Sequence, residues 1–355
     1  MRQNITNHEK SLPKLDLKDR KILRELDMDA TMPLNELAKK LKISRYVAEY
    51  RIKRMLKEKI ISLPYVVTDS AVVGVRWFRV LFRLKNVDEQ KKKEIISYFA
   101  SLDSTIWVAS IGNKWDVIIN FMALDSFEFN SIFEEIIIHY GKFIHGYEIL
   151  TYIDIHDNER EYILPEYNKE MHGNKPKKVF FHEMKHNQEI KLDETDKSII
   201  DLLSKNAWLS YTEIAHKLTI SRNTVKYRLE QHRKNKVILG SRLMIHPSAL
   251  GYQSYMLFLD IHNLTPEREK VLQEFAKNKQ NIIYVVKHIG RYRIGFECEV
   301  QDQKEFQKLL VETRDKFEDI ISDYEIFPIF YDHKINYFPM IGRLIYGEDN
   351  PKLKK

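Results

Sequence analysis

The sequence of 355 residues contains one cysteine, 11 glycines and 10 prolines, and no apolar run long enough to span a membrane. The lone cysteine, Cys298, can form neither an internal disulfide nor a cysteine metal site. It lies in a run typical of a strand, where we expect it to be buried. The first 14 residues are polar and lack the apolar centre of a secretory signal. These features predict a soluble, cytoplasmic protein.

Common enzyme motifs are also missing. The sequence has no nucleophile elbow, no glycine-rich phosphate loop and no cluster of metal ligands. It therefore predicts no catalytic residues, no metal and no cofactor, and it favours a protein that is not an enzyme.

Positive charge is concentrated in two short windows. Residues 12–64 contain 14 lysines and arginines against 8 aspartates and glutamates, and residues 191–242 contain 11 against 6. The rest of the chain has 33 basic and 37 acidic residues, although the net charge of the whole chain is +7. The two basic windows favour a polyanionic partner, with solvated lysine faces as the alternative.

The sequence repeats itself at an offset of 177 residues, which aligns Leu15–Asp19 with Leu192–Asp196 and Ile43–Arg45 with Ile220–Arg222. A period this long indicates a duplicated pair of domains. The polar residues between the copies predict a flexible linker, into which Val179-Phe180-Phe181 brings a short apolar segment that could dock. The expected divisions are 12–64, 65–156, the linker 157–191, 192–245, 246–340 and a polar basic tail at 341–355.

Each copy begins with the pattern of a helix-turn-helix. Asp16 and Asp193 precede apolar-periodic runs and are typical helix N-caps. Second helices are predicted at Pro33–Leu41 and Ser210–Leu218. A three-residue turn then leads directly into a third helix, which requires two helices that cross steeply. Each third helix precedes β-branched residues that predict the start of a wing strand.

The third helices carry cations and amides on their exposed faces. Arginine can pair with guanine, asparagine with adenine and lysine with phosphate when a helix lies in the major groove. We expect Arg45, Tyr46, Arg222 and Asn223 to read bases, and Lys226, Arg228, Arg51 and Arg54 to hold phosphates. A helical hairpin that only packs is the alternative. The full predicted DNA-binding set is Ser44, Arg45, Tyr46, Glu49, Tyr50, Arg51, Lys53, Arg54, Ser221, Arg222, Asn223, Thr224, Lys226, Tyr227, Arg228 and Arg233.

The pattern L-D-x-x-D…E-L-A-x-x-L-x-I-S-x…R…I resembles the winged-helix domain of the Lrp/AsnC, or feast/famine, transcription regulators. The second copy is the closer match, from Leu192–Asp196 through Ile220–Leu229. The first copy has Val47-Ala48-Glu49 where the family usually has a threonine-valine pair and a basic residue. Both copies carry lysine, Lys59 and Lys236, where the family typically ends the recognition helix with glycine. The resemblance implies a transcription regulator that binds double-stranded DNA.

Downstream of each helix-turn-helix, β-branched and aromatic runs alternate with charged segments of helix length in the order βαββαβ. This order predicts an α+β fold: two winged helix-turn-helix domains and two ferredoxin-like domains in tandem. In the Lrp/AsnC family the ferredoxin-like part resembles the small-molecule-sensing and oligomerising RAM domain. The predicted segments are Arg76–Leu84, Asp88–Ser101, Thr105–Ile111, Trp115–Ala123, Asp125–Tyr140 and Ile144–Asp154, then Gln253–Ile261, Pro266–Asn278, Asn281–Ile289, Tyr292–Val300, Gln303–Phe317 and Ile320–Tyr331.

One apolar sheet face in each ferredoxin-like domain has no helices of its own to cover it. Because the second copy is tethered to the first, we expect an internal pseudo-dimer, with a homodimer or higher oligomer as a further possibility. The two third helices would then enter successive major grooves roughly 34 Å apart. Their different exposed residues predict an asymmetric pair of half-sites.

In the family, effectors bind between sensor domains near a turn with glycine followed by aspartate. The first copy has a similar turn, and a carboxylate there would suit an amino acid. The second copy has isoleucine at the aspartate position, so it has lost this site or takes an anion through arginine. Ordinary hairpin residues are the alternative. The candidate effector residues are Gly112, Asn113, Trp115 and Asp116 in the first copy, and Gly290, Arg291 and Arg293 in the second.

Two other functions share these features. Siroheme decarboxylases have the same two-domain fold, but the histidines that could face a tetrapyrrole here, His139, His145, His156 and His288, are scattered. A protein-interaction scaffold is the other alternative. Salt dependence separates it from a DNA-binding protein, since phosphate contacts release counterions.

Overall fold

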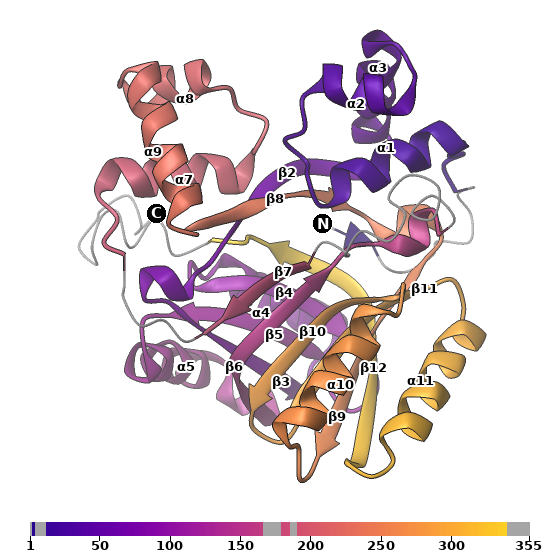
Figure 1. Ribbon diagram of the computed structural model, residues 1–355. Coiled ribbons are helices and arrows are strands. Elements are labelled where there is room, and N and C mark those ends of the chain that lie inside the picture. Colours follow the sequence, from indigo (N-terminus) through magenta and orange to yellow (C-terminus); the bar gives the residue numbers. More distant parts are fainter. Residues whose placement is uncertain (1, 4–11, 166–178, 185–189, 339–355) are drawn as a thin grey trace.

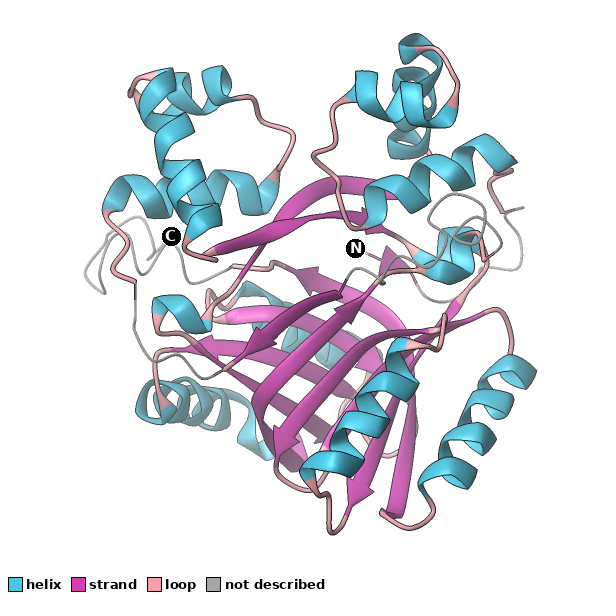
Figure 2. Cartoon of the chain, in the orientation of Figure 1, coloured by secondary structure: helices cyan, strands magenta, loops and turns pink. Residues whose placement is uncertain are grey.

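The computed structural model describes residues 2–3, 12–165, 179–184 and 190–338. Two three-helix units lie on one side of a large curved sheet, and the helices α4, α5, α10 and α11 lie against the outside of that sheet (Figures 1 and 2). We call α1–α3 helical unit one and α7–α9 helical unit two. Their helices are α1 (Leu17–Asp27), α2 (Leu34–Leu41), α3 (Arg45–Lys57), α7 (Glu194–Lys205), α8 (Tyr211–Leu218) and α9 (Arg222–Lys234).

Helices α1 and α7 begin where the sequence predicts. Asp16 Oδ1 accepts a hydrogen bond from Asp19 N at 2.9 Å, and Asp19 Oδ2 accepts one from Asp16 N at 3.0 Å. Asp193 and Asp196 form the same reciprocal capping box. Such a box satisfies two amide groups that a helix start would otherwise leave without partners.

The βαββαβ order is confirmed in both copies, which we call sheet unit one and sheet unit two. Most predicted bounds agree with the structure to within two residues, while the last strand of each unit runs four residues further than expected. The elements of unit one are β3 (Arg76–Leu84), α4 (Glu89–Ser101), β4 (Thr105–Ile111), β5 (Val117–Ala123), α5 (Ser126–Tyr140) and β6 (Ile144–Asn158). Those of unit two are β9 (Gln253–Ile261), α10 (Pro266–Lys277), β10 (Ile282–Ile289), β11 (Ile294–Val300), α11 (Gln303–Phe317) and β12 (Ile321–Ile335).

Alternate residues of each strand enter different cores, as the two-residue period of a strand requires. On β3, Val80 packs in the outer core beneath α4 and α5, whereas Leu81 packs in the inner core. Unit two has its own outer core beneath α10 and α11, in which Cys298 is fully buried. The inner core is shared, because it contains buried side chains of both units, among them Leu81 and Phe258.

The two sheet units join at both edges. Strand β6 pairs with β10, and β12 pairs with both β4 and β9. The order β12-β4-β5-β3-β6-β10-β11-β9 therefore closes on itself as a barrel. This closure confirms the internal pseudo-dimer, and it leaves none of these strands as a free edge.

The strands that follow α3 and α9 do not form separate wings. Strand β2 (Ile61–Thr68) pairs antiparallel with β8 (Ile238–Ile245), so the two copies share one two-stranded ribbon. The expectation of a wing within each copy is wrong in this respect, because each strand finds its partner in the other copy. The ribbon joins the two helical units and runs across one mouth of the barrel (Figure 1).

Part of the predicted linker is ordered. Strand β7 (Val179–Glu183) pairs with the end of β6, and a Cβ atom at Gly240 would lie 2.6 Å from the Phe180 ring. The short 3-10 helix η3 (Glu161–Ile163) packs in the core of helical unit one. The flexible-coil reading is therefore wrong for these segments, whose apolar side chains dock on the fold. The remaining linker residues 166–178 and 185–189, and the tail 341–355, lie outside the described residues.

Candidate nucleic-acid interface and an internal cavity

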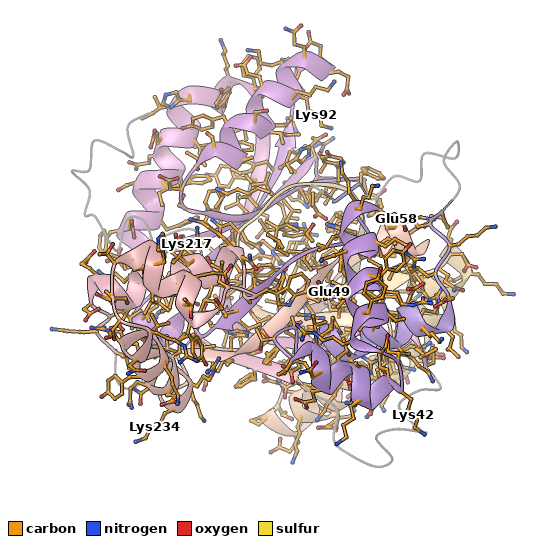
Figure 3. All side chains as sticks on the ribbon, turned by 90° about the horizontal axis from the view of Figure 1, so that it is seen from above. Lys42, Glu49, Glu58, Lys92, Lys217 and Lys234 are labelled. Atoms are coloured by element: carbon orange, nitrogen blue, oxygen red, sulfur yellow. The ribbon has the colours of Figure 1, made fainter. Side chains whose placement is uncertain are left out.

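The outer faces of α3 and α9 are rich in exposed aromatic and basic side chains. Tyr46, Tyr50 and Tyr227 are 77%, 59% and 63% exposed. Tyr50 and Tyr227 occupy equivalent positions in the two copies. Large exposed side chains that recur at one position favour an interaction surface over a packing face. Figure 3 shows both helical units from above, with Glu49 and Glu58 on the first and Lys217 and Lys234 on the second.

Serine caps fix the start of both helices. Ser44 Oγ accepts a hydrogen bond from Val47 N at 3.2 Å, and Ser221 Oγ accepts one from Thr224 N at 3.0 Å. Arg45 and Arg222 follow directly and are exposed. Within the described part of the chain, no carboxylate lies within 4.0 Å of either guanidinium. Each helix thus presents a cation and a partly open amide end, which is favourable for anions.

Three predicted phosphate-binding arginines are engaged inside the helical units. Arg51 Nη1 lies 2.7 Å from Asp16 Oδ1 and 2.8 Å from Asp19 Oδ1. Arg54 Nη2 lies 2.6 Å from Asp19 Oδ2. Arg228 contacts the equivalent capping carboxylates of α7. These bonds tie the third helix to the first, so the arginines position the helix, and their predicted phosphate contacts stay a prediction.

The same contacts act on the capping carboxylates. Burial opposes ionisation of Asp16, but the Asp19 amide and the Arg51 guanidinium outweigh it and lower the pKa of Asp16 to about 2. Asp193 has a lowered pKa for the same reason, with Arg228 as its cation. Both caps are therefore ionised at neutral pH, which keeps the clamp between the helices closed.

The two helices differ in charge at one equivalent position, which is half-buried in α3 and exposed in α9. Glu49 stands on α3, where its carboxylate pairs with Lys53 Nζ at 2.7 Å. Lys226 stands at that position on α9, with Glu230 at 3.9 Å. Near a phosphate backbone a carboxylate repels and an ammonium attracts, so the two faces are chemically distinct. Arg233 and Asn223 add further exposed polar groups on α9.

The first predicted effector turn connects β4 to β5, and its polar groups are engaged within the chain. Asp116 Oδ2 accepts a hydrogen bond from Leu84 N at 2.8 Å, and Asp116 Oδ1 lies 3.3 Å from Lys92 Nζ. The Asn113 side chain donates to the Ile326 carbonyl. The other predicted residues of this turn are Gly112, which packs closely against the Phe330 ring, and Trp115, which is buried.

The second predicted effector turn connects β10 to β11. Arg291 Nη2 lies 2.9 Å from Glu325, which also pairs with Lys114 of the first turn at 3.3 Å. Gly290 has a φ of 136°, which suits glycine, and Arg293 is exposed. The two turns therefore meet at one carboxylate. Their effector role stays a prediction.

The candidate histidines for a tetrapyrrole do not share a site. His139 is exposed on α5, and His145 is exposed near the start of β6. His156 packs against Phe181 of β7. His288 is buried beside Tyr152, where burial and Arg79 lower its pKa well below the usual value.

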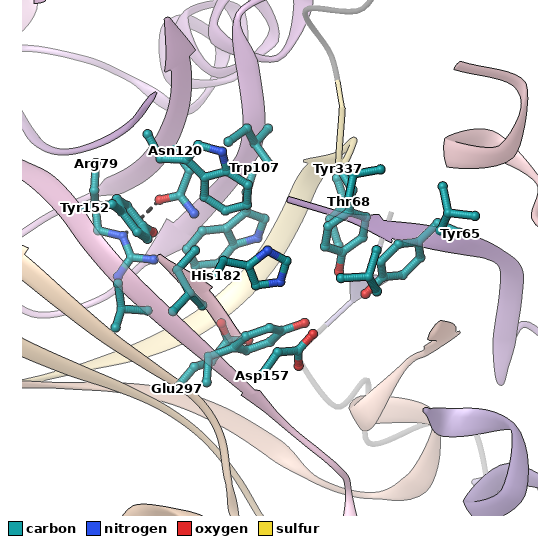
Figure 4. Close-up of a pocket in the computed structure, with 18 of the residues that line it drawn as sticks. Tyr65, Thr68, Arg79, Trp107, Asn120, Tyr152, Asp157, His182, Glu297 and Tyr337 are labelled. Carbon is teal, nitrogen blue, oxygen red and sulfur yellow. Dashed lines mark hydrogen bonds between the residues drawn. The ribbon is translucent and has the colours of Figure 1, made fainter. Parts of the chain in front are cut away.

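An internal cavity of about 90 Å³ lies between the barrel and the ribbon, and the sequence analysis missed it (Figure 4). Strand residues that face inward cannot be assigned to a cavity until the register of both copies is known, so no sequence pattern marks it. At about 30 Å³ for each liquid water, the cavity has room for roughly three. Its lining residues include Tyr65, Thr68, Trp77, Arg79, Trp107, Asn120, Tyr152, Asp157, His182, Tyr284, Glu297 and Tyr337.

The helical units match a known family model. Residues 15–56 and 192–231 correspond to the AsnC-type helix-turn-helix domain. An uncharacterized HTH-type transcriptional regulator of Pyrococcus furiosus is 30% identical over 120 residues, which cover 33% of this chain and 79% of that protein. The chain belongs to the Lrp/AsnC family. It is therefore a DNA-binding transcription regulator by family, with the helix-turn-helix present twice.

Other relatives also match over only part of the chain. An uncharacterized HTH-type transcriptional regulator of Pyrococcus horikoshii is 27% identical over 138 residues, which cover 39% of this chain and 85% of that protein. The regulatory protein AsnC of Escherichia coli is 33% identical over 61 residues, 17% of this chain and 40% of that protein.

The whole duplicated architecture of this Lrp/AsnC chain also occurs in a solved structure. The siroheme decarboxylase NirDL has a TM-score of 0.59 and 13% sequence identity, over 92% of this chain and 98% of that one. At this identity the likeness shows a shared fold alone. No described helix of the Lrp/AsnC chain has the length and apolarity to cross a membrane.

Proposed function

We propose that this regulator places both recognition helices, α3 and α9, on one DNA duplex and reads two different half-sites. The observation that carries the proposal is the ribbon, which holds two helical units with exposed basic third helices on the same side of the barrel. A paired reader needs a fixed distance between its helices, and an antiparallel ribbon supplies it.

The proposed contacts differ between the two helices. Arg45 and Tyr46 on α3, and Arg222 and Asn223 on α9, stand in the first turn, where a helix in the major groove meets base edges. Lys226, Arg233 and Lys53 would contact phosphates. The carboxylate of Glu49 suits an amino group such as that of cytosine and disfavours close phosphates. The preferred operator is therefore asymmetric.

The first test is the binding of Arg222→Ala to an operator obtained by genome-wide mapping of bound sites. This variant should lose about 1–3 kcal/mol on the operator and relax the base preference in one half-site. Fluorescence anisotropy with the operator, half-site variants and random DNA measures both effects. Arg83→Ala, which removes an exposed arginine of the barrel strand β3, is the matched control and should bind as the parent does. An equal loss on random DNA would leave Arg222 with a charge role only.

The salt dependence of the same binding separates a DNA reader from a protein-interaction scaffold. Affinity should fall steeply between about 50 and 200 mM salt, because each phosphate contact releases counterions. A flat response would favour the scaffold.

We also propose that DNA binding responds to a small molecule. A ligand acts only through its different affinity for two arrangements of the readers. The ribbon could transmit such a response, because β2 directly follows helical unit one in the chain and also lines the internal cavity with Tyr65 and Thr68. Measurement of operator affinity with and without the ligand tests the response.

A further inference from the structure

We propose that the cavity beneath the ribbon is a binding site for a small monocarboxylate, held by Arg79. The inference names the ligand class of the effector response proposed above, and its regulatory meaning rests on that function. The binding itself does not, because it is measured without DNA.

Arg79 differs from the other buried arginines of the described chain. Arg24 pairs with Glu159 at 3.2 Å, and Arg160 pairs with Asp27 and Glu299 at 3.1 and 2.9 Å. Arg242 pairs with Asp27 and Asp157. Among the described residues, no carboxylate lies within 4.0 Å of the Arg79 guanidinium, although Arg79 is only 3% exposed. The Glu297 carboxylate acts on Arg79 through its charge from beyond this distance. A buried cation without a direct ion pair is costly, so an anionic ligand in contact with Arg79 would be favoured there.

The surroundings of Arg79 fix its direction without neutralising it. Its Nε donates to Asn120 Oδ1 at 2.9 Å, and Nη1 lies 3.8 Å from Met256 Sδ. The guanidinium carbon lies 5.0 Å from the centre of the Tyr152 ring and 5.8 Å from that of Trp107. Aromatic faces orient a guanidinium but leave its in-plane N–H groups available. A carboxylate is the group whose two oxygens match such a fork.

The duplication makes this a single site. Arg79 pairs in register with Asn120 on β3 and β5, and the equivalent pair on β9 and β11 is Met256 with Glu297. One half of the barrel therefore supplies a cation and an amide where the other supplies a thioether and a carboxylate. Identical halves would have brought two arginines together across the pseudo-twofold axis, where they would repel.

The other groups that line the cavity limit which ligands can bind there. Two carboxylates line the cavity. Asp157 pairs with Arg242, and Glu297 acts through its charge on Arg79, so the site disfavours a dianion. His182 is buried, and its lowered pKa keeps the imidazole neutral at pH 7. Trp77 and Trp107 give the walls an apolar aromatic surface. A monoanion with a short apolar body, of about six non-hydrogen atoms or fewer, fits this charge and volume.

The test uses propionate as the probe, with propionamide as its neutral isostere. Trp77 and Trp107 line the cavity, so intrinsic tryptophan fluorescence of the full chain reports occupancy. Propionate should produce a saturable change and raise the melting temperature with the logarithm of its concentration. Propionamide should do neither at the same concentrations.

Arg79→Met and Arg83→Met form a matched pair of variants on β3, one facing the cavity and one exposed. Arg79→Met should weaken propionate binding at least about tenfold, because the charge-assisted bonds are lost. Its melting temperature without ligand should equal or exceed that of the parent, since methionine already stands at the equivalent position of the other half. Arg83→Met should bind as the parent does. The proposal is overturned if the parent shows no saturable response, or if both variants respond alike.

Discussion

Four turns in the helical units rest on residues that rarely adopt a left-handed backbone, and one of them is Lys42, with a φ of 52°. Lys59 and Lys236 have φ values of 57°, at the position where the relatives' pattern expects glycine. Thr219, in the turn between α8 and α9, has a φ of 56°. A β-branched residue in this region is strained by roughly 1–2 kcal/mol.

Replacement of Thr219 by glycine should therefore stabilise the protein. The relief of strain exceeds the added entropy of a glycine in the unfolded chain, which costs about 0.4–1 kcal/mol, so we expect a net gain of about 0.5–1 kcal/mol. Urea unfolding measures it. Thr212→Gly, at an exposed helical position of α8, is the control and should destabilise by a similar amount. If both substitutions change the free energy of unfolding in the same direction, the strain at Thr219 is contradicted.

At the scale of elements, a buried ionic cluster joins parts of the chain that are distant in sequence. Asp27 at the end of α1 contacts Arg160 near η3 and Arg242 on β8. Arg160 also contacts Glu299 on β11. The cluster therefore connects helical unit one, the ribbon and sheet unit two. Burial opposes ionisation of Asp27, but the two arginines lower its pKa.

Asp27→Ala should destabilise the protein by about 3–5 kcal/mol, because it leaves buried guanidinium groups without their shared anion. Urea unfolding at pH 7 measures this loss. Asp201→Ala removes a helical pair with Lys205 at 2.7 Å and should cost less than about 1 kcal/mol. If Asp27→Ala lowers the free energy of unfolding by no more than Asp201→Ala does, the cluster does not stabilise the folded chain.

Helices and strands could be predicted from the sequence because capping residues and local periodicity fix them. Asp16 and Asp193, for example, cap α1 and α7 as expected. Pairing between copies could not be predicted, since either partner satisfies the same hydrogen bonds of a strand. The ribbon β2–β8 and the docking of β7 on β6 are of this kind. At the candidate DNA interface, residue types indicated the exposed arginines, but they did not reveal which arginines form ion pairs with the capping carboxylates.

At the scale of the whole molecule, several histidines are buried in their neutral form. Burial lowers the pKa of His182 to about 4, partly offset by a hydrogen bond with the Thr68 backbone. His333 also has a pKa of about 4, lowered by burial and by Lys92. Burial lowers the pKa of His156, His232 and His288 in the same direction. At these histidines the unfolded chain therefore binds more protons than the folded protein below pH 6.5.

The free energy of unfolding should consequently fall on acidification. A histidine with a lowered pKa gives its full contribution above pH 6.5 and loses it as the pH falls towards 4. For His182 the loss between pH 7 and 5 is about 2 kcal/mol. Urea unfolding at both pH values measures the effect. Between pH 7 and 5, the free energy of unfolding of His182→Asn should fall by about this amount less than that of the parent. His139→Asn, exposed on α5, is the control and should keep the parent's dependence. An unchanged loss in His182→Asn would contradict the assignment.

Strand β12 is the last described strand of the chain, and it lies between β4 of the first copy and β9 of the second. During synthesis the edge strand β4 of the first copy therefore keeps an unpaired edge until residues 321–335 have left the ribosome. Such an edge can pair with another nascent chain. Contacts between strands as far apart in sequence as β4 and β12 also form slowly. Strand β12 closes the barrel, so truncation before residue 321 should leave β4 and β9 with unpaired edges. We expect such a truncated protein to aggregate and not to work as a smaller regulator.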